Sequence, residues 1–303
     1  MKKIYFIILN YNTVNETKEC VDSIRRLSGS DFLKQIIIID NASTDNSFMK
    51  LTEYFYGDED VETYRMDNNL GFSKGNNYGY QVVRKKGDTF FCVICNSDIK
   101  FVQEDFLNRL EKEYRKSHFY VCGPDVYCES RENSYCKGHQ SPMYPFEWNK
   151  WYINTYRLYC ELVCRRLKND SLSIIKSLIV QIQWLGWKGL RKVSTETYYK
   201  NYRKTRHEDV PLHGSCIVVS KLFLENEETL FFPETKFYGE ELLLYLRCKR
   251  NNYKMVFNPE LLVHHLQGKA TSSINNVKQI SLFRYENYAV GAKIYLEKLQ
   301  NED

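Results

Sequence analysis

Short apolar runs alternate with helical patterns along the N-terminal third of the chain. Ile4–Leu9 is continuously apolar, and Gln35–Asp40 contains four consecutive isoleucines. Both runs are typical of strands buried on both faces of a parallel sheet. Between them, Cys20, Ile24 and Leu27 recur at helical spacing. This strand–helix–strand order predicts a parallel pair of strands joined by a right-handed crossover.

The same order repeats further along the chain. Glu62–Met66 has the pattern of a short strand, a helix is predicted from about Lys74 to Lys86, and Thr89–Cys95 is another buried strand. Strands separated by helices at this spacing are typical of an open α/β sheet. The sequence therefore predicts a nucleotide-binding half-sheet, whose ligands bind beyond the carboxyl ends of the strands.

Between Cys122 and about Val210 the strand patterns weaken, while tryptophan, tyrosine, lysine and arginine become frequent. An apolar stripe at helical spacing comprises Leu172, Ile175, Ile179, Ile182 and Leu185. A basic amphipathic helix that carries tryptophan can lie in the interface of an anionic membrane. The alternative is a helix that packs on the main domain with its tryptophans at the rim. The segment 156–192 stays open between these two interpretations.

Strand and helix patterns return after Leu212. Cys216–Val219 and Met255–Phe257 are predicted strands, and Glu240–Lys249 and Val277–Gln300 are predicted helices. We expect one continuous α/β domain in three parts. These are a nucleotide-binding half (1–125), a largely helical insertion (126–210) and a second half that ends in helices (211–303).

Composition narrows the class of protein. The 303 residues are 43% hydrophobic and 27% charged, as expected of a globular chain that forms a core. The net charge of +5 is too small to require nucleic acid, and the chain has no recognised nucleic-acid-binding module, so nucleic acid is not an expected partner. The charge is compatible with a diphosphate substrate or an anionic membrane surface.

Cysteine spacing and the N-terminal segment bear on location. The ten cysteines show no two pairs at zinc-ribbon spacing, so reduced thiols in a cytoplasmic protein are expected. The apolar run after Lys3 is too short for a signal peptide, and no stretch approaches the roughly 20 apolar residues that span a bilayer. We expect a cytoplasmic protein that is soluble or peripheral on the inner face of the cell membrane.

Short polar side chains follow each of the first four predicted strands. They are Asn10 and Asn12 after the first strand, Asp40 after the second, Asn69 after the third, and Asn96 and Asp98 after the fourth. Each alone is explained as a helix cap or a turn residue. Together they are predicted to meet at the carboxyl edge of the sheet, where open α/β proteins bind their ligands.

The two carboxylates among these side chains suggest different chemistry. Asp40 can accept hydrogen bonds from a base imide or a ribose hydroxyl. Asp98 follows a buried strand, close to where a diphosphate would lie, and a carboxylate there suits Mg²⁺ or Mn²⁺. Gly71 and Gly75 match neither the dinucleotide-binding nor the P-loop glycine pattern. A diphosphate bound here would most naturally be neutralised by a metal ion.

Five segments resemble, in order, those of the family-two glycosyltransferases, which have the GT-A fold. They are FIILNYN (6–12), IIIIDNASTDNS (36–47), NLGFSKGNNYG (69–79), CNSDI (95–99) and GSCIVVSKLFLE (214–225), the last continuing into FYGEELLLYLRC and PELLVHH. The pattern is similar to that of bacterial rhamnosyltransferase-like members that assemble polysaccharides. The resemblance implies a GT-A sheet flanked by helices, in which 211–303 forms the acceptor and catalytic half.

The resemblance also implies roles for individual residues. Asp40 would contact the nucleoside, and the floor of the nucleotide pocket would be shaped by Asn69, Gly71 and Asn76. Asp98, the last residue of the family's aspartate motif, would bind the metal. His264 matches a histidine that approaches the metal or the diphosphate in some relatives. The alternative is that His264 and His265 are a polar pair at the end of a strand.

The family's catalytic base normally comes from a Glu-Asp pair at the start of a helix. This chain has Glu240-Glu241 instead. Glu241 occupies the aspartate position and is the expected base, with Glu240 in reserve. The alternative is that both carboxylates only stabilise the helix N-terminus through its dipole. With one base and no nucleophile, the resemblance implies inversion at the anomeric carbon.

The expected function is metal-dependent, inverting transfer of a sugar from a UDP-, dTDP- or GDP-linked donor to a saccharide acceptor, which can be lipid-linked, in cell-surface polysaccharide synthesis. The alternative is an inactive nucleotide-sugar-binding protein on the same fold, since fold does not fix function. A nucleotidyltransferase that makes the activated sugar fits less well. Such enzymes usually have a glycine-rich loop where this chain has Asn10-Tyr11-Asn12.

Overall fold

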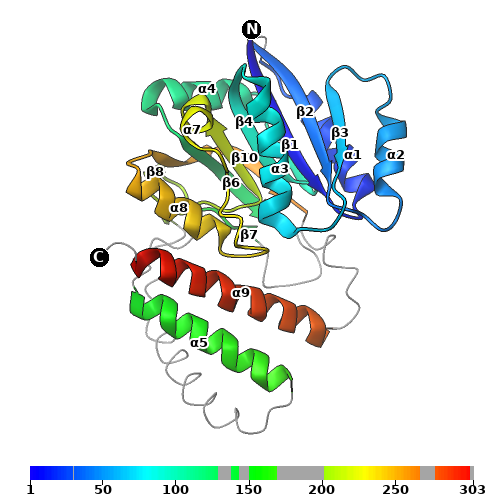
Figure 1. Ribbon diagram of the computed structural model, residues 1–303. Helices are drawn as coiled ribbons and strands as arrows, with labels where there is room; N and C mark the ends of the chain where they lie inside the picture. Colours follow the sequence, from blue (N-terminus) through cyan, green and yellow to red (C-terminus); the bar gives the residue numbers. More distant parts are fainter. Residues whose placement is uncertain (30, 129–137, 143–149, 169–200, 267–276, 301–303) are drawn as a thin grey trace.

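The computed structural model describes the chain except for residues 30, 129–137, 143–149, 169–200, 267–276 and 301–303. At its centre is one sheet with the strand order β3-β2-β1-β4-β9-β6-β10-β5 (Figure 1). These strands are β1 (Lys2–Asn10), β2 (Phe32–Asp40), β3 (Val61–Arg65), β4 (Thr89–Asn96), β5 (Ile99–Phe101), β6 (Val121–Cys128), β9 (Cys216–Ser220) and β10 (Met255–His265). The short strands β7 (Gly138–His139) and β8 (His207–Glu208) pair with β6 and β10.

The principal strands run mostly in one direction. β1 pairs in parallel with β2 and β4, β2 pairs in parallel with β3, and β6 pairs in parallel with β10. β9 is antiparallel to both β4 and β6, so the two parallel groups share one direction. The predicted mostly parallel α/β sheet is confirmed. The carboxyl ends of β1, β2 and β4 therefore meet at one edge of the sheet.

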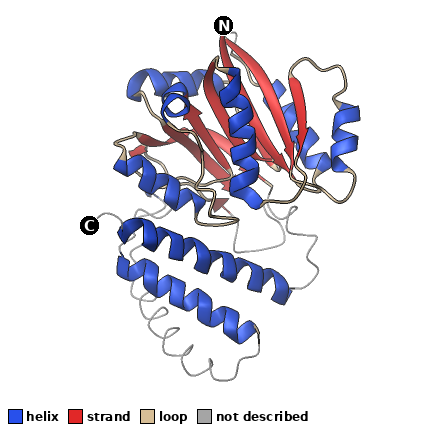
Figure 2. Cartoon of the chain, viewed as in Figure 1, coloured by secondary structure: helices blue, strands red, loops and turns tan. Residues whose placement is uncertain are grey.

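Helices cover both faces of the sheet, as Figure 2 shows. They are α1 (Val14–Arg25), α2 (Ser47–Tyr54), α3 (Gly71–Lys86), α4 (Phe106–Ser117), α5 (Lys150–Leu167), α7 (Lys221–Asn226), α8 (Glu240–Arg250) and α9 (Val277–Gln300). Alternate residues of β1 point to opposite faces. Phe6 and Ile8 pack in a core cluster with residues of α1, α2 and α4, whereas Tyr5 and Ile7 pack with residues of α3, α7 and α8.

The predicted strands and helices that fall within the described residues are present, with ends that differ by a few residues. β10 is longer than predicted, and α2, α4, α7, β5, β6 and the short strands β7 and β8 were not predicted. α5 lies in the insertion that was expected to be largely helical. In β6 the residues Gly123, Pro124 and Asp125 interrupt the apolar pattern. The predicted amphipathic stripe from Leu172 to Leu185 lies outside the described residues. Within the part of the chain that the structure describes, no helix is long and apolar enough to cross a membrane.

Two long helices lie beyond the carboxyl edge of the sheet. In Figure 1, α9 lies below the sheet and α5 lies below α9. A third core cluster joins them to α8, and it contains Ile153 of α5, Leu243 of α8, and Ala292 and Tyr295 of α9. This cluster fixes the helix pair α5–α9 next to the sheet edge where the predicted site residues lie.

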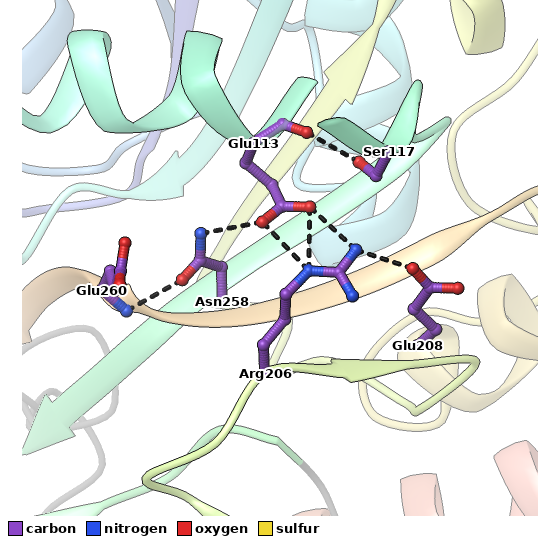
Figure 3. Close-up of polar contacts among 6 residues, drawn as sticks. All are labelled: Glu113, Ser117, Arg206, Glu208, Asn258 and Glu260. Carbon is purple, nitrogen blue, oxygen red and sulfur yellow. Dashed lines mark hydrogen bonds and ion pairs between the residues drawn. The ribbon is translucent and has the colours of Figure 1, made fainter. Parts of the chain in front are cut away.

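A buried ion pair fastens the chain where it re-enters the sheet after residue 200. Arg206 donates hydrogen bonds to both carboxylate oxygens of Glu113 on α4, and a further one to Glu208 (Figure 3). Asn258 of β10 donates to the same Glu113 carboxylate at 3.1 Å. The Glu113 side chain is only 3% exposed, so these donors offset the cost of burying its charge. The network ties the re-entering strand β8 to α4 and β10.

Candidate active site

Asn10 and Asp40 end adjacent strands, and they form a buried polar hub. The Asn10 amide nitrogen donates to Oδ2 of Asp40 at 2.8 Å and to Oγ of Ser43 at 3.2 Å. Its carbonyl oxygen accepts from the hydroxyls of Thr13 and Thr17. These contacts use the full hydrogen-bonding capacity of Asn10, which is completely buried. Asn10 therefore joins the loops that follow β1 and β2.

Asp40 is also enclosed, with 1% of its surface exposed. Its Oδ1 accepts from the backbone N–H of Ser43 at 3.0 Å, which closes a tight turn after β2. The next turn contains Asn46 in the left-handed conformation (φ 63°), which asparagine tolerates better than most residues. Asn12 is half-buried and joins this loop, because its Oδ1 accepts from the backbone N–H of Thr44 at 2.8 Å.

The third predicted loop is linked to the second by Asn41. The amide nitrogen of Asn41 donates to Oδ1 of Asn69 and to the carbonyl of Gly71, both at 3.2 Å. Asn76 lies one turn into α3, is buried, and donates to the carbonyl of Phe72 at 3.0 Å. The structure thus brings Asp40, Asn69 and Gly71 together, through Asn41, at the edge of the sheet.

Gly71 is where the two halves of the protein meet. Its φ is +84°, and a Cβ atom there would lie 2.5 Å from the carbonyl oxygen of Lys236. The backbone N–H of Phe72 donates to the same carbonyl at 2.8 Å, and the hydroxyls of Ser73 and Thr235 are 2.7 Å apart. Only glycine combines this φ with so close a backbone approach. The predicted nucleotide loop is therefore held against the segment that leads to Glu240.

Asp98 lies beside His265. Nε2 of His265 is 3.2 Å from Oδ1 of Asp98, and both side chains are at most 10% exposed. On the other side of the ring, Nδ1 lies 3.2 Å from Oε1 of Gln140. An amide oxygen only accepts, so a proton on Nδ1 would be donated to Gln140, and Nε2 would then be available to a metal ion between the ring and the carboxylate. A carboxylate oxygen and an imidazole nitrogen that face each other fit a divalent cation.

The structure brings His265, not its neighbour His264, to Asp98. His264 points to the other face of β10, where its ring lies 5.5 Å from that of Tyr127. Residues of β10 alternate between the buried positions of Leu261, Val263 and His265 and the half-buried positions between them. The sequence itself does not show this alternation, because Leu261, Leu262 and Val263 are all apolar.

His213 was not singled out in the sequence, yet it lies next to this pair. Its ring is 6.0 Å from that of His265, and its Nδ1 accepts from the backbone N–H of Ser215 at 3.2 Å. Burial of the ring, and next the nearby His265, lower the pKa of His213 to about 3. His213 is therefore neutral at physiological pH, with its proton on Nε2.

Asn96, at the end of β4, ties the segment 213–215 to the sheet. It is half-buried, and its backbone N–H donates to the carbonyl of Ser215 at 2.9 Å. The hydroxyl of Ser97, next to it, is 2.8 Å from that of Thr13 after β1. The loops after β1 and β4 and the segment before β9 are thereby joined around Asp98.

Glu240 and Glu241 begin α8. Gly239 precedes them with a φ of +93°, a backbone conformation that suits glycine. A Cβ atom on Gly214 would lie 2.6 Å from Oε1 of Glu241, so the Glu241 side chain rests directly on Gly214. Gly214 is the residue after His213. One short segment, 213–215, therefore connects the Asp98–His265 pair to the Glu241 carboxylate.

The two glutamates differ in environment. Burial, and then the charge of Glu241, raise the pKa of Glu240 well above its usual range. Burial also raises the pKa of Glu241, but hydrogen bonds from the backbone N–H groups of Glu241, Gly214 and Gly239 oppose that rise. Glu240 is 4% exposed, whereas Glu241 is half-buried. Neighbouring carboxyl groups in different environments can divide acid and base roles.

Among the described residues, no group of three or more histidine, cysteine, aspartate or glutamate side chains converges as a metal site. Asp98 and His265 form a pair rather than a complete ligand set. A cation that they bind would take its other ligands from elsewhere, such as the oxygens of a diphosphate or water.

Comparison with known proteins gives the family. The model of the family described as glycosyl transferase family 2 matches residues 5–166, more than half of the 303-residue chain. A search of curated proteins finds no match.

Solved structures share the fold. A crystal structure of residues 1–349 of TarS from S. aureus has a TM-score of 0.50 and 14% sequence identity over 93% of this chain and 65% of that one. A crystal structure of GalNAc-T7 with UDP, GalNAc and Mn²⁺ has a TM-score of 0.57 and 14% identity over 88% of this chain and 44% of that one. The chain thus spans less than two thirds of either relative, and at this identity the likeness concerns the fold alone.

Proposed function

The chain belongs to glycosyl transferase family 2, and from this we propose that it transfers a sugar from a nucleoside-diphosphate donor to a hydroxyl of a saccharide acceptor. The observation that carries the proposal is the link through residues 213–215. It places a metal-suited pair, Asp98 and His265, next to a half-buried carboxylate, Glu241. This pairing suits a reaction in which a phosphate leaves as a hydroxyl is deprotonated.

The donor would bind across the edge formed by the loops after β1, β2, β3 and β4. Asn69, which is half-buried, would face the nucleoside, and the enclosed Asp40 would position the loop beneath it. Gly71 would allow the backbone to approach the nucleoside. GalNAc-T7, which shares the fold, was crystallised with UDP. UDP-, dTDP- and GDP-linked sugars are all candidate donors for this chain.

Asp98 and His265 would hold Mn²⁺ or Mg²⁺, which would neutralise the charge that develops on the departing diphosphate. GalNAc-T7 was crystallised with Mn²⁺. Gln140 would fix the orientation of the His265 ring by accepting from Nδ1, as residues behind a metal ligand commonly do. We place His265 in the role that the sequence resemblance gave to His264.

Glu241 would take the proton from the acceptor hydroxyl at Oε1 or Oε2. The backbone N–H of Gly214 would hold the carboxylate in place and favour its ionised form. Glu240, whose pKa is raised further, would stay protonated and limit the charge beside the base. A single base with no nucleophile is the arrangement of a direct displacement, which inverts the anomeric carbon.

We also propose a place for this reaction. The acceptor would be a growing cell-surface polysaccharide, and the protein would work in the cytoplasm, at the inner face of the membrane. Basic residues at the end of α5, including Arg165 and Arg166, support contact with anionic lipid. Flotation with liposomes that contain or lack anionic lipid tests this part. If the protein binds neither kind of liposome, the proposed contact with the membrane is excluded.

The central experiment measures nucleotide binding by thermal unfolding, with and without Mn²⁺. A nucleoside diphosphate at about 100 times its dissociation constant should stabilise the fold by about 2.7 kcal/mol. We expect one of UDP, dTDP and GDP to do so only with the metal, and Asp98→Ala to lose the effect. If no nucleotide stabilises the wild type under either condition, the proposal is wrong.

The alternative is a nucleotide-sugar-binding protein without activity, since Glu240-Glu241 departs from the family's Glu-Asp pair. Glu241→Gln separates the two functions. Turnover that is lost in this variant while nucleotide binding persists supports the enzyme. Wild-type protein that binds nucleotide but never releases nucleoside diphosphate from any donor would support the binding protein.

A further inference from the structure

Beside Glu241, aromatic side chains from three separate elements face one another. They are Phe237 and Tyr238 from the turn before α8, Phe283, Tyr285 and Tyr288 from α9, and Tyr159 from α5; we call them the aromatic wall. We propose that the aromatic wall is the subsite for the saccharide acceptor and takes an oligosaccharide of at least two sugar units. This inference rests on the proposed transferase function and adds the location and class of the acceptor.

The four tyrosine rings of the aromatic wall form a continuous series. The Tyr238 and Tyr288 ring centroids are 4.6 Å apart, Tyr288 and Tyr285 are 6.2 Å apart, and Tyr285 and Tyr159 are 6.0 Å apart. Phe237 and Phe283 form a further pair at 5.1 Å. The series begins at the turn that carries the catalytic pair and continues to the helix farthest from the sheet (Figure 1).

These rings do not belong to the hydrophobic core. The three core clusters contain residues of α5, α8 and α9, but none of the six residues of the aromatic wall. All six are half-buried, so part of each side chain is accessible. By contrast, Tyr295, on the same helix α9, is 4% exposed and belongs to the core. Tyr156 of α5 links the two groups, since it packs against the third core cluster and its ring centroid lies 6.0 Å from that of Tyr288.

The aromatic wall starts within reach of the base. Tyr238 lies two residues before Glu240 in the sequence. Burial, next the nearby Tyr238, and then the Glu241 carboxylate raise the pKa of Tyr288. Burial also raises the pKa of Tyr238, whose hydroxyl is hydrogen-bonded to Arg284. Both phenols therefore stay protonated and can donate hydrogen bonds next to the position where the acceptor hydroxyl must lie.

The chemistry of the aromatic wall matches a sugar better than a lipid chain. A sugar ring has an apolar face of C–H groups, which packs on an aromatic face, and a rim of hydroxyls, which need donors and acceptors. Four of the six residues are tyrosines, which supply both. Arg284 adds an exposed donor beside Tyr238. An acyl or isoprenoid chain has no hydrogen-bonding groups to offer Arg284 or the tyrosine hydroxyls, whereas the hydroxyl rim of a sugar has both donors and acceptors.

The test measures sugar binding directly, without turnover. The probes are disaccharides of glucose, galactose, rhamnose and N-acetylglucosamine, followed by saturation-transfer NMR in the presence of the stabilising nucleotide and Mn²⁺. We expect at least one disaccharide to bind, and Tyr285→Ala and Tyr159→Ala each to weaken binding by about tenfold. Tyr285→Phe keeps the ring and should lose less. Tyr56→Ala, at a residue 88% exposed on another part of the surface, should bind as wild type does.

The result separates this inference from the proposed function. Nucleotide and Mn²⁺ must stabilise all four variants as they stabilise wild type; if they fail with wild type itself, it is the transferase function that is wrong. If nucleotide binding is intact but no disaccharide binds, or if Tyr285→Ala and Tyr159→Ala bind as tightly as Tyr56→Ala, the aromatic wall is not the acceptor subsite.

Discussion

Gly291 of α9 lies directly against the backbone of Tyr238. A Cβ atom on Gly291 would be 2.6 Å from the Tyr238 carbonyl oxygen and 3.4 Å from the Cα of Gly239. Tyr238 itself has a φ of +64°, which is uncommon for a bulky residue and persists only where the surroundings enforce it. The helix α9 thus holds the strained turn from which Glu240 and Glu241 begin.

We predict that Gly291→Ala lowers kcat by about tenfold while the affinity for the donor nucleotide changes little. The new methyl group meets a backbone oxygen, so the turn that carries Glu241 must move, and small misplacements of a catalytic group are costly. Intrinsic helix propensity acts the other way, since alanine favours a helix over glycine by about 1 kcal/mol. Steady-state kinetics with a nucleotide titration checks the split.

Val290→Ala is the matched control for Gly291. It changes the neighbouring residue on α9, which is 49% exposed, and should leave kcat unchanged. Gly291→Ser should be worse than Gly291→Ala because the side chain is larger. A Gly291→Ala protein with wild-type kcat would show that α9 does not position the base.

Removal of Arg206 should destabilise the fold. Arg206→Ala leaves the Glu113 carboxylate, 3% exposed, with Asn258 as its remaining side-chain donor. Breaking a fully buried pair costs about 3–5 kcal/mol, and we expect about 2–3 kcal/mol here because a quarter of the Arg206 side chain is exposed. Urea unfolding measures the loss. Arg115→Ala, at a side chain 71% exposed, should cost less than about 1 kcal/mol.

The double variant Arg206→Ala/Glu113→Gln provides a further check. Replacing the carboxylate by a neutral amide removes the uncompensated charge, so the double variant should be more stable than Arg206→Ala alone. Equal stability of the two proteins would mean that the charge of Glu113 is not what Arg206 compensates.

The fold and the site differ in how far the sequence predicts them. Strands such as Gln35–Asp40 are local patterns, so apolar runs and loop motifs were enough to predict the parallel sheet and its ligand-binding edge. β6 escaped prediction because Gly123, Pro124 and Asp125 become a strand only through pairing with the distant β10. What makes this segment a strand is its tertiary pairing, and its local sequence does not contain that information.

The choice between two adjacent histidines shows the same limit at the site. His264 and His265 are indistinguishable by residue type. Only the side of β10 to which each side chain points decides which of them lies beside Asp98. The pairing of β10 with β6 shifts between Asn258 and Leu262. Such an irregularity changes which residues face a given side, and a sequence pattern does not reveal its outcome. Similarly, the contact between Gly214 and Glu241 joins segments that are remote in the sequence.

Glu240 leads to a prediction about stability and pH. A carboxyl group whose pKa is raised in the folded state binds its proton more tightly there than in the unfolded chain. Stability is therefore greatest below the unfolded pKa of about 4.3 and falls as the pH rises toward the raised pKa. Burial is the main cause of the raised pKa of Glu240. Glu240→Gln removes this cost and should raise the melting temperature at pH 7 more than at pH 4.

Glu53→Gln serves as the reference for Glu240→Gln, since Glu53 is exposed on α2. It should change the melting temperature little at either pH. An equal increment at pH 4 and pH 7 would show that folding does not raise the pKa of Glu240. A melting temperature lowered only at pH 7 would show that the ionised carboxylate stabilises the fold.

The two neighbouring histidines can be told apart by metal-dependent nucleotide binding. We predict that His265→Ala weakens the binding of the stabilising nucleotide in the presence of Mn²⁺ by at least about tenfold, because the imidazole that faces Asp98 is lost. His264→Ala removes the same side chain one position earlier, on the other face of β10, and should bind as wild type does. Both proteins should bind nucleotide equally in EDTA. Titration by calorimetry at fixed Mn²⁺ gives the four affinities. The reverse result, with the loss confined to His264→Ala, would assign the metal to the face of Tyr127 and remove Asp98–His265 from the proposed site.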